Sequence, residues 1–327
     1  MPEFRQNLAT KDWVVIASER RARPEDLMRP ASPKPAADGC PFCPGGEGLA
    51  RPASYQLGEG SAWKVRVVGN KFPVLVSGHP APKDRHPLYR SLPGEGVHEL
   101  VIDSPDHLAT LDAMPAGAAR DLVGVYRERF RTAAANDRIA LTVLFKNHGP
   151  ASGASIGHPV TQLVGSSVVP SHIRHRMDEA ARYYESAGAC VFCRMSEVEQ
   201  EEKTRVVEEN DHFVAFVLYA ALSPFHLWIL PKRHAASFAD MNDKELDSLA
   251  AILQRLARRL KAALGDPSFN FVLQSTPLDR GTTEAYHWYL SLVVRVGGGS
   301  GFEMGSGMFT NTVVPEDAAR FLQSAKT

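Results

Sequence analysis

The sequence predicts an α+β protein built from two copies of one unit, each held together by a bound metal ion. Its four cysteines form two C-x-x-C pairs, and each pair is followed by two widely spaced histidines. Each half also combines strand-like runs with one long amphipathic helix. Strands that flank a helix without a βαβ alternation favour a largely antiparallel sheet. We therefore expect two domains, residues 1–176 and 177–327, each with mainly antiparallel strands and one long helix.

The residues that could bind a metal occur in the same order in both halves. They are Cys40, Cys43, His107 and His158 in the first half, and Cys190, Cys193, His234 and His287 in the second. Two thiolates and two imidazoles form the ligand set of a closed tetrahedral zinc site. Two disulfides are the alternative, but this spacing in a long chain without a secretion signal favours metal. We expect zinc at both sites, with another divalent metal such as iron as the alternative at the second.

The expected elements follow from local pattern. Apolar residues at helical spacing predict long helices over residues 116–136 and 243–264, and a shorter helix over 177–189 that joins the halves. Residues 23–52 are rich in Pro, Ala and Gly and should be irregular, held mainly by the first cysteine pair. The glycine-rich stretch 297–307 should be a flexible loop, either plain surface or a lid that contacts ligand.

Composition excludes some classes of function. Lys plus Arg and Asp plus Glu both number 37, so the formal net charge is zero. That balance argues against sequence-independent nucleic-acid binding, which requires a basic surface. No stretch approaches the roughly 18 apolar residues of a membrane span, and the N-terminus does not resemble a signal peptide. We expect a cytoplasmic protein that can still hold a local site for a small phosphorylated substrate.

The strongest local signature is a glycine- and serine-rich loop between two strands. The preceding strand ends with Asn147, and the following strand places His158, Val160 and Gln162 on one face, because alternate residues of a strand share a face. Small residues let backbone N–H groups approach phosphate oxygens closely, and the hydroxyl groups of Ser152 and Ser155 add donors. A loop of this composition is more often a simple turn. We predict a phosphate-binding loop here because this one lies between Asn147 and the candidate metal ligand His158.

These motifs together resemble the galactose-1-phosphate uridylyltransferase family of the histidine-triad superfamily, closest in pattern to its ADP-glucose phosphorylase-like branch. The matching motifs run nearly end to end. They are C-P-F-C, N-K-F-P, H-E-L-V-I-D-S-P-D-H, F-K-N-H-G, G-A-S, H-P-x-x-Q, P-K-R-H and G-F-E-M-G-S-G. The resemblance implies two histidine-triad-like halves, transfer of a nucleoside monophosphate between a nucleotide sugar and a phosphate-bearing substrate, and a homodimer that shares its active site across the interface.

The resemblance also assigns roles to individual residues. It implies that Asn70, Lys71 and Phe72 line the nucleotide pocket. By the same resemblance, Asn147, Ser155 and Gln162 contact the phosphates, whereas Phe302 and Glu303 lie near the sugar. The histidines His98, His148 and His226 are interpreted as ordinary structural residues, because a lone histidine is usually a satisfied core or surface side chain.

One residue departs from the family pattern. The family has His-x-His-x-Gln, in which the second histidine is the nucleophile, whereas this chain has Val160 at that position. An isopropyl group can neither attack phosphorus nor accept a proton. We therefore expect an enzyme that works without a covalent nucleotidyl-histidine, by direct in-line attack of a second substrate. The alternatives are a catalytically inactive nucleotide-binding protein and an engineered inactive variant of a conventional transferase.

Overall fold

The structure is a computed structural model that describes residues 1–20, 22–28, 36–78, 86, 88–277, 284–297 and 300–326. The strands are β1 Glu3–Gln6, β2 Trp13–Ile16, β3 Ala53–Leu57, β4 Val65–Gly69, β5 Gly96–Ile102, β6 Leu141–His148, β7 Val160–Ser166, β8 Val206–Glu209, β9 Phe213–Val217, β10 His226–Pro231, β11 Phe269–Gln274, β12 Tyr289–Val294 and β13 Phe309–Asn311. The helices are α1 Ala116–Ala134, α2 Ser171–Ala187, α3 Val191–Glu202, α4 Asp243–Leu264, α5 Gly301–Ser306 and α6 Pro315–Ser324.

One large sheet runs through both halves. Its ten strands lie in the order β3-β4-β5-β7-β6-β11-β12-β10-β9-β8, and every neighbouring pair in it is antiparallel. The halves meet edge to edge, because β6 of the first half pairs with β11 of the second. A separate three-stranded sheet joins β1, β2 and β13, and there β13 runs parallel to β2. The expected α+β class with mainly antiparallel sheets is confirmed.

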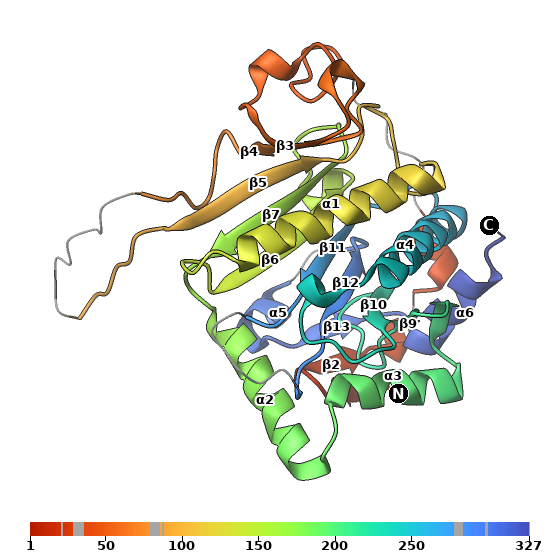
Figure 1. Cartoon of the computed structure of the whole chain (residues 1–327). Coiled ribbons are helices and arrows are strands. Elements are labelled where there is room, and N and C mark those ends of the chain that lie inside the picture. Colours follow the sequence, from red (N-terminus) through yellow and green to blue (C-terminus); the bar gives the residue numbers. More distant parts are fainter. Residues whose placement is uncertain are drawn as a thin grey trace.

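The two long helices lie side by side on one face of the large sheet (Figure 1). The amphipathic pattern explains this, because the buried residues of α1 and α4 recur at three- and four-residue spacing along one side of each helix. Helix α4 begins at a capping box, in which Asn242 accepts the backbone N–H of Glu245 at 3.0 Å. Burial of these apolar faces against the strands forms the main core.

The expected elements are mostly found near their predicted positions. The structure places the long helices at 116–134 and 243–264, against predictions of 116–136 and 243–264. Helix α2 starts six residues before the predicted 177–189 helix and ends at Ala187. The described part of the glycine-rich stretch 297–307 is not simply a loop, because residues 301–306 form the short helix α5. Its capping box between Ser300 and Glu303 stabilises this turn despite the glycines.

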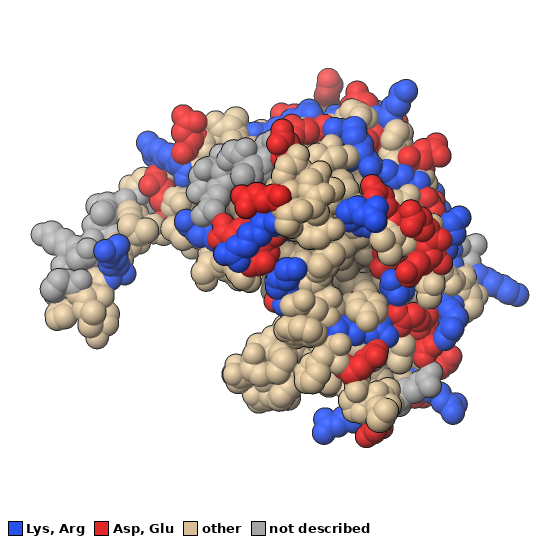
Figure 2. All heavy atoms as spheres, turned by 90° about the horizontal axis from the view of Figure 1, so that it is seen from below, with Lys and Arg blue, Asp and Glu red and all other residues tan. Residues whose placement is uncertain are grey.

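Charges of both signs are interspersed over the surface. Figure 2 shows Lys and Arg next to Asp and Glu on the face drawn, without one large patch of either sign, as a chain of zero net charge suggests. Among the described residues, no helix is both long and apolar enough to cross a bilayer. The described part of the connection between β4 and β5 extends away from the body (Figure 1) and exposes Phe72, Leu88 and Tyr89.

Candidate functional site

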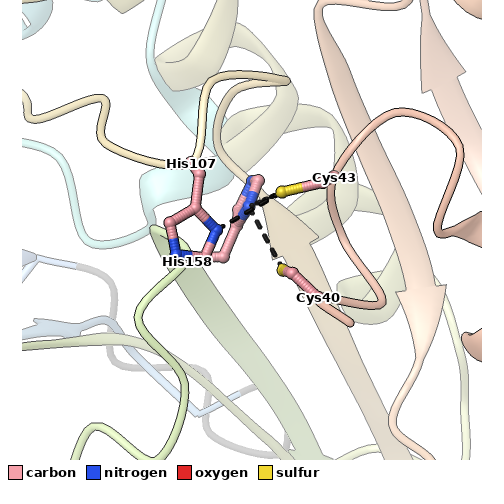
Figure 3. Close-up of side chains that lie close together, drawn as sticks. All are labelled: Cys40, Cys43, His107 and His158. Atoms are coloured by element: carbon pink, nitrogen blue, oxygen red, sulfur yellow. Dashed lines mark hydrogen bonds between the residues drawn. The ribbon is translucent and has the colours of Figure 1, made fainter. Parts of the chain in front are cut away.

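The four expected ligands of the first half meet in space (Figure 3). Their ligand atoms all lie within 4.8 Å of one another, although they come from three separate segments. Cys43 Sγ lies 3.3 Å from His107 Nδ1 and 3.6 Å from His158 Nδ1, and Cys40 Sγ lies 3.7 Å from His158 Nδ1. Around a tetrahedral zinc ion with ordinary bond lengths, sulfur and nitrogen ligands are separated by about 3.6 Å. The residues therefore fit a cation of that size.

Neighbouring groups prepare the two imidazoles for metal binding. His158 Nε2 lies 2.7 Å from the carbonyl oxygen of Ser104, so its N–H donates there and Nδ1 keeps a lone pair that faces the thiols. Burial lowers the pKa of His158, which favours the neutral form that binds metal. His107 Nε2 is buried and has no hydrogen-bond partner among the described residues. When Nδ1 of His107 binds a cation, this second nitrogen carries a proton and can donate it to a water or a ligand.

The thiols of both pairs need a cation to be charged together. Burial and then the proximity of Cys40 raise the pKa of Cys43 to about 11. In the second pair, a hydrogen bond with Cys193 lowers the pKa of Cys190 to about 4, whereas the pKa of Cys193 is raised by the same neighbour. In each C-x-x-C pair, one of the two thiols therefore keeps its proton. A bound divalent cation would displace that proton and let both thiols ionise.

The second ligand set is less complete than the first. Cys190, Cys193 and His234 form a group whose ligand atoms lie within 4.8 Å of one another, and His287 does not belong to it. His287 is nevertheless close, since its ring centroid lies 5.4 Å from that of His234. Its Nδ1 lies 2.8 Å from the carbonyl oxygen of Trp288, and the ring also forms a hydrogen bond with the backbone of Arg233. The structure therefore gathers three of the four predicted ligands and leaves the fourth adjacent.

A cavity of about 310 Å³ adjoins the first metal group. The glycine- and serine-rich loop forms one wall of it, and Asn147, Ser155, His107 and His158 all line it. Gly149 allows the loop to turn, because its φ is +79° and a Cβ there would lie 2.4 Å from Ser268 Oγ. The loop thus rests on the second half of the chain.

Two predicted phosphate contacts of the loop have different surroundings. Ser152 donates its hydroxyl proton to the carbonyl oxygen of Gly149 at 2.6 Å, so it stabilises the loop and does not face a ligand as expected. Ser155 is exposed on the cavity wall. Asn147 Oδ1 accepts a hydrogen bond from Asn270 Nδ2 at 2.7 Å, which leaves its own amide group on the loop side.

Val160 begins β7 and lies on the sheet face away from the long helices. It pairs with Ile102 of β5 and packs against the small apolar cluster around Phe42, the aromatic residue of the first C-x-x-C pair. Gln162 shares its face, because β7 alternates half-buried and buried positions. The side chain at the family's nucleophile position is therefore held between apolar neighbours beside the metal group.

Gln162 is connected to the predicted nucleotide loop through His98. Gln162 Oε1 lies 2.9 Å from His98 Nε2, and the backbone N–H of Val74 donates to His98 Nδ1 at 3.2 Å. Asn70 Nδ2 lies 3.1 Å from His98 Nε2 and 3.4 Å from Nδ1, while Asn70 Oδ1 accepts the backbone N–H of Phe72 at 2.9 Å. The structure thus joins Asn70 and Gln162 through a histidine that the sequence analysis treated as structural.

The side chains of the other predicted site residues are exposed or half-buried. The side chain of Phe72 is 81% exposed, and Lys71 is exposed as well. Phe302 and Glu303 lie on α5, where the Glu303 carboxylate accepts the backbone N–H of Ser300 at 2.9 Å. Among the described residues, no hydrogen bond or ion pair joins either α5 side chain to the first half.

A buried polar cluster on the opposite face of the sheet was not predicted. Lys146 forms a short ion pair with Asp103, and Tyr126 donates toward Asp103 at 3.3 Å. Thr161 lies 2.6 Å from the Tyr126 hydroxyl and also donates to Asp103. The backbone N–H of Asp103 in turn donates to Pro159 at 3.1 Å. The cluster fixes the start of β7, and therefore the direction of His158 and Val160.

The corresponding face of the second half is filled by protein. Arg176 of α2 donates to Tyr289 Oη at 2.8 Å and to Gln274 Oε1 at 3.1 Å. Tyr289 occupies the position equivalent to Val160, and its ring lies 4.1 Å from that of Trp228 and 5.4 Å from that of Phe192. Burial raises the pKa of Tyr289, so the phenol stays neutral. This half therefore lacks room for a nucleotide on the same face.

Comparisons with known proteins agree with this architecture. The chain matches the N-terminal domain of the galactose-1-phosphate uridyl transferase family over residues 1–175 and the C-terminal domain over residues 176–291. It is 32% identical to an ADP-glucose phosphorylase of Arabidopsis thaliana, over 98% of this chain and 92% of that protein. It is 28% identical to a galactose-1-phosphate uridylyltransferase of Thermotoga maritima, over 100% and 99% of the two chains.

A solved structure gives the same result. The crystal structure of an A. thaliana ADP-glucose phosphorylase with bound ADP-glucose superimposes with a TM-score of 0.85, at 30% identity and with full coverage of both chains. The fold is that of a nucleotidyltransferase-like protein. The chain belongs to the galactose-1-phosphate uridyl transferase family, which confirms the resemblance found in the sequence.

The sequence indicated that His98 has a specific role, but only when the two halves are compared with each other. His98 opens the strand that leads to the ligand His107, and His226 opens the strand that leads to the ligand His234. A histidine that recurs at the same place in both halves is less readily explained as an isolated core residue. The buried cluster of Lys146 and Asp103 has no comparable sequence signal, because its partners come from separate strands and a helix.

Proposed function

We propose that this protein is a nucleotidyl-transferring enzyme that acts on a nucleotide sugar and a phosphate-bearing second substrate. The observation that carries the proposal is the cavity beside the first Cys/His group, which Asn147, Ser155 and the glycine-rich loop line. Relatives named ADP-glucose phosphorylase and galactose-1-phosphate uridylyltransferase, which align along nearly the whole chain, support this class of reaction. ADP-glucose is the first substrate to test, because a similar structure holds it.

The proposed reaction proceeds without a covalent intermediate. With Val160 at the position of the nucleophile, an oxygen of the second substrate attacks the phosphorus directly. The new P–O bond forms as the bond to the departing sugar phosphate breaks, which takes the electron pair with it. The chain contributes positioning and hydrogen-bond donors, above all the side chains of Asn147 and Gln162.

Metal has a structural role in this proposal. Zinc would be held by Cys40, Cys43, His107 and His158, and four protein ligands leave no open position for an activated water. The second set, Cys190, Cys193 and His234 with His287 nearby, would hold zinc or another divalent metal. Each ion would supply the positive charge that lets its two thiols ionise together.

We further propose a cytoplasmic homodimer in which α5 of one subunit approaches the cavity of the other. On that helix Phe302 is exposed and Glu303 is half-buried, and among the described residues no hydrogen bond or ion pair joins either side chain to a predicted site residue. Light scattering at micromolar concentration tests the assembly. A strictly monomeric protein that turns over substrate would exclude shared sites.

Product analysis tests the reaction itself. Incubation with ADP-glucose and inorganic phosphate should give ADP and a sugar phosphate, without a nucleotidyl adduct on the intact protein by mass spectrometry. Initial rates should follow sequential kinetics, because no product leaves before the second substrate binds. A trapped nucleotidyl-protein would contradict the direct mechanism. Tight binding without turnover, across a panel of nucleotide sugars, would identify the protein as a nucleotide-binding protein without this activity.

A further inference from the structure

We propose that His98 is a positioning residue that turns the Gln162 amide toward the ligand and links it to the predicted nucleotide loop. The proposal rests on the proposed function, because it assumes that Gln162 contacts a phosphate. It is supported by a backbone N–H that makes His98 Nδ1 an acceptor, and by a repeat of the same geometry in the second half.

The protonation of His98 follows from its neighbours. The backbone N–H of Val74 can only donate, so His98 Nδ1, at 3.2 Å, is the acceptor. In a neutral imidazole the proton is then on Nε2, which lies 2.9 Å from Gln162 Oε1. Asn70 Nδ2 lies 3.1 Å from Nε2 and 3.4 Å from Nδ1, and with the proton on Nε2 only the longer of these two contacts can be a hydrogen bond. His98 is only 9% exposed, so solvent does not compete strongly for these bonds.

This arrangement determines what Gln162 presents to a ligand. The oxygen of its side-chain amide is occupied by His98, so the NH₂ group points away from the imidazole. Gln162 is two residues from Val160 on the same strand face, a separation of roughly 6.5 Å along the strand. A donor at that place is complementary to phosphate oxygens, whereas an outward carbonyl oxygen would repel them. His98 therefore selects the useful one of two amide orientations.

The second half contains the same arrangement of hydrogen bonds around His226. The backbone N–H of Leu222 donates to His226 Nδ1 at 3.4 Å, and His226 Nε2 lies 2.8 Å from Ser291 Oγ. The registers correspond, because His98 pairs with Val164 and His226 pairs with Val293, so each histidine reaches diagonally to the residue two places earlier. In both halves the imidazole thus connects a loop N–H to the strand that follows the second metal-ligand histidine. The partner of the imidazole on that strand is the Gln162 amide in the first half and the Ser291 hydroxyl in the second.

The hydrogen bonds of His98 to Val74 and Asn70 extend its effect to the predicted nucleotide loop. Val74 and Asn70 both contact the imidazole, and Asn70 also accepts the N–H of Phe72. Segment 70–74 and Gln162 are therefore connected through a single side chain. Loss of the imidazole should loosen both the predicted nucleotide contact and the predicted phosphate contact.

Binding measurements with matched variants test the proposal. The Kd of ADP-glucose by titration calorimetry should rise about tenfold in His98→Leu, the loss expected for one well-placed hydrogen bond. His98→Gln should recover most of this affinity, because its amide N–H can still donate to Gln162. Gln162→Glu should keep the bond to His98 but weaken binding by more than tenfold, since it places a carboxylate beside the phosphates.

The second half supplies the control. His226→Leu removes the equivalent hydrogen bonds and should lower the melting temperature, yet it should leave the Kd of ADP-glucose unchanged. Equal changes of Kd in His98→Leu and His226→Leu would show that the effect is one of general stability and would overturn the proposal. Unchanged affinity in His98→Leu would overturn it as well.

A measurement without ligand separates this inference from the proposed function. Nitrogen-15 NMR of labelled histidine, with His98→Gln used for assignment, should show the Nε2–H tautomer at His98. A Nδ1–H tautomer would exclude the orientation proposed for Gln162. If ADP-glucose fails to bind the unmodified protein, the proposed function is wrong for that substrate, while the tautomer still decides whether His98 orients Gln162.

Discussion

The two halves of the chain share one plan but differ at the sheet face beside each metal group. In both halves the aromatic residue of the C-x-x-C pair packs against this face, Phe42 near Val160 and Phe192 against Tyr289. In the first half a cavity and a glycine-rich loop remain open next to it. In the second half Arg176 and Tyr289 fill the corresponding space. The two halves therefore differ in that one repeat keeps a cavity beside its metal group, whereas side chains fill the corresponding space of the other.

The largest expected difference concerns the metal groups. Cys43→Ser should lower the metal content from two equivalents per chain to one and should destabilise the first half by several kcal/mol, because metal binding is coupled to folding. Cys193→Ser should cost less, since its group contains three gathered ligands and an exposed His234. Elemental analysis together with thermal unfolding measures both effects. If a chelator removes metal from the first group before the second, the comparison is wrong.

The next difference concerns Val160 and Tyr289, which occupy equivalent positions in the two halves. Val160→His should create a nucleotidyl-protein adduct with ADP-glucose, because His158 and Gln162 already flank that position. The rate of nucleotidyl transfer should rise by roughly a hundredfold or more, the scale of a well-placed imidazole in catalysis. Tyr289→His is the matched control and should give no adduct, since Arg176 blocks that face. Mass spectrometry of both intact variants decides the point, and an adduct on the Tyr289 variant would show that the second face is accessible.

Arg176 should matter for stability and not for binding. Arg176→Met removes the donors to the buried Tyr289 and the half-buried Gln274, at a cost of about 1 to 3 kcal/mol. Chemical denaturation should report this loss. The Kd of ADP-glucose should stay the same, whereas Asn147→Ala should weaken binding with little change in stability. The reverse pattern would place the ligand in the second half.

The most gradual effect is a dependence of stability on pH, which is spread over several pH units. Burial, and then the charge of Arg176, lowers the pKa of His226 to about 3. The unfolded chain therefore binds this proton more readily, so the stability contribution is fully present above about pH 6.5 and is lost as pH falls toward 3. The free energy of unfolding should decrease by up to about 1.4 kcal/mol per pH unit in that window. His226→Gln, which keeps a donor for Ser291, should flatten this part of the pH profile measured by denaturation.

The sequence predicted those features that repeat or that form local patterns. Helix α4 was placed correctly at both ends, because its apolar spacing and its cap at Asn242 lie within the segment itself. The first metal group was predicted from ligand chemistry alone, although its ligands span 118 residues. The division at residue 176 stays a prediction, and a continuous sheet shows how closely the two parts are joined.

Other features depend on contacts that a sequence does not display. Helix α5 was missed because glycines suggested a loop, although Ser300 and Glu303 form a recognisable capping box. The position of His287 outside the second group was also not predicted, because it depends on how the segments that carry the four residues pack together. The ion pair of Lys146 and Asp103 is buried between a strand and the loop after another strand, so no local rule indicates it. Long-range polar contacts were therefore the main part that sequence reasoning could not supply.

The seam between β6 and β11 makes each half dependent on the other. A fragment that ended before residue 177 would leave the backbone donors and acceptors of β6 unpaired along an open strand edge, which favours self-association. The same fragment would lose Asn270, which holds Asn147 and the loop carbonyl of Ser152, and Ser268, which holds Ala151. The cavity of the first half therefore owes part of its shape to residues of the second half, so the two halves form one structural unit.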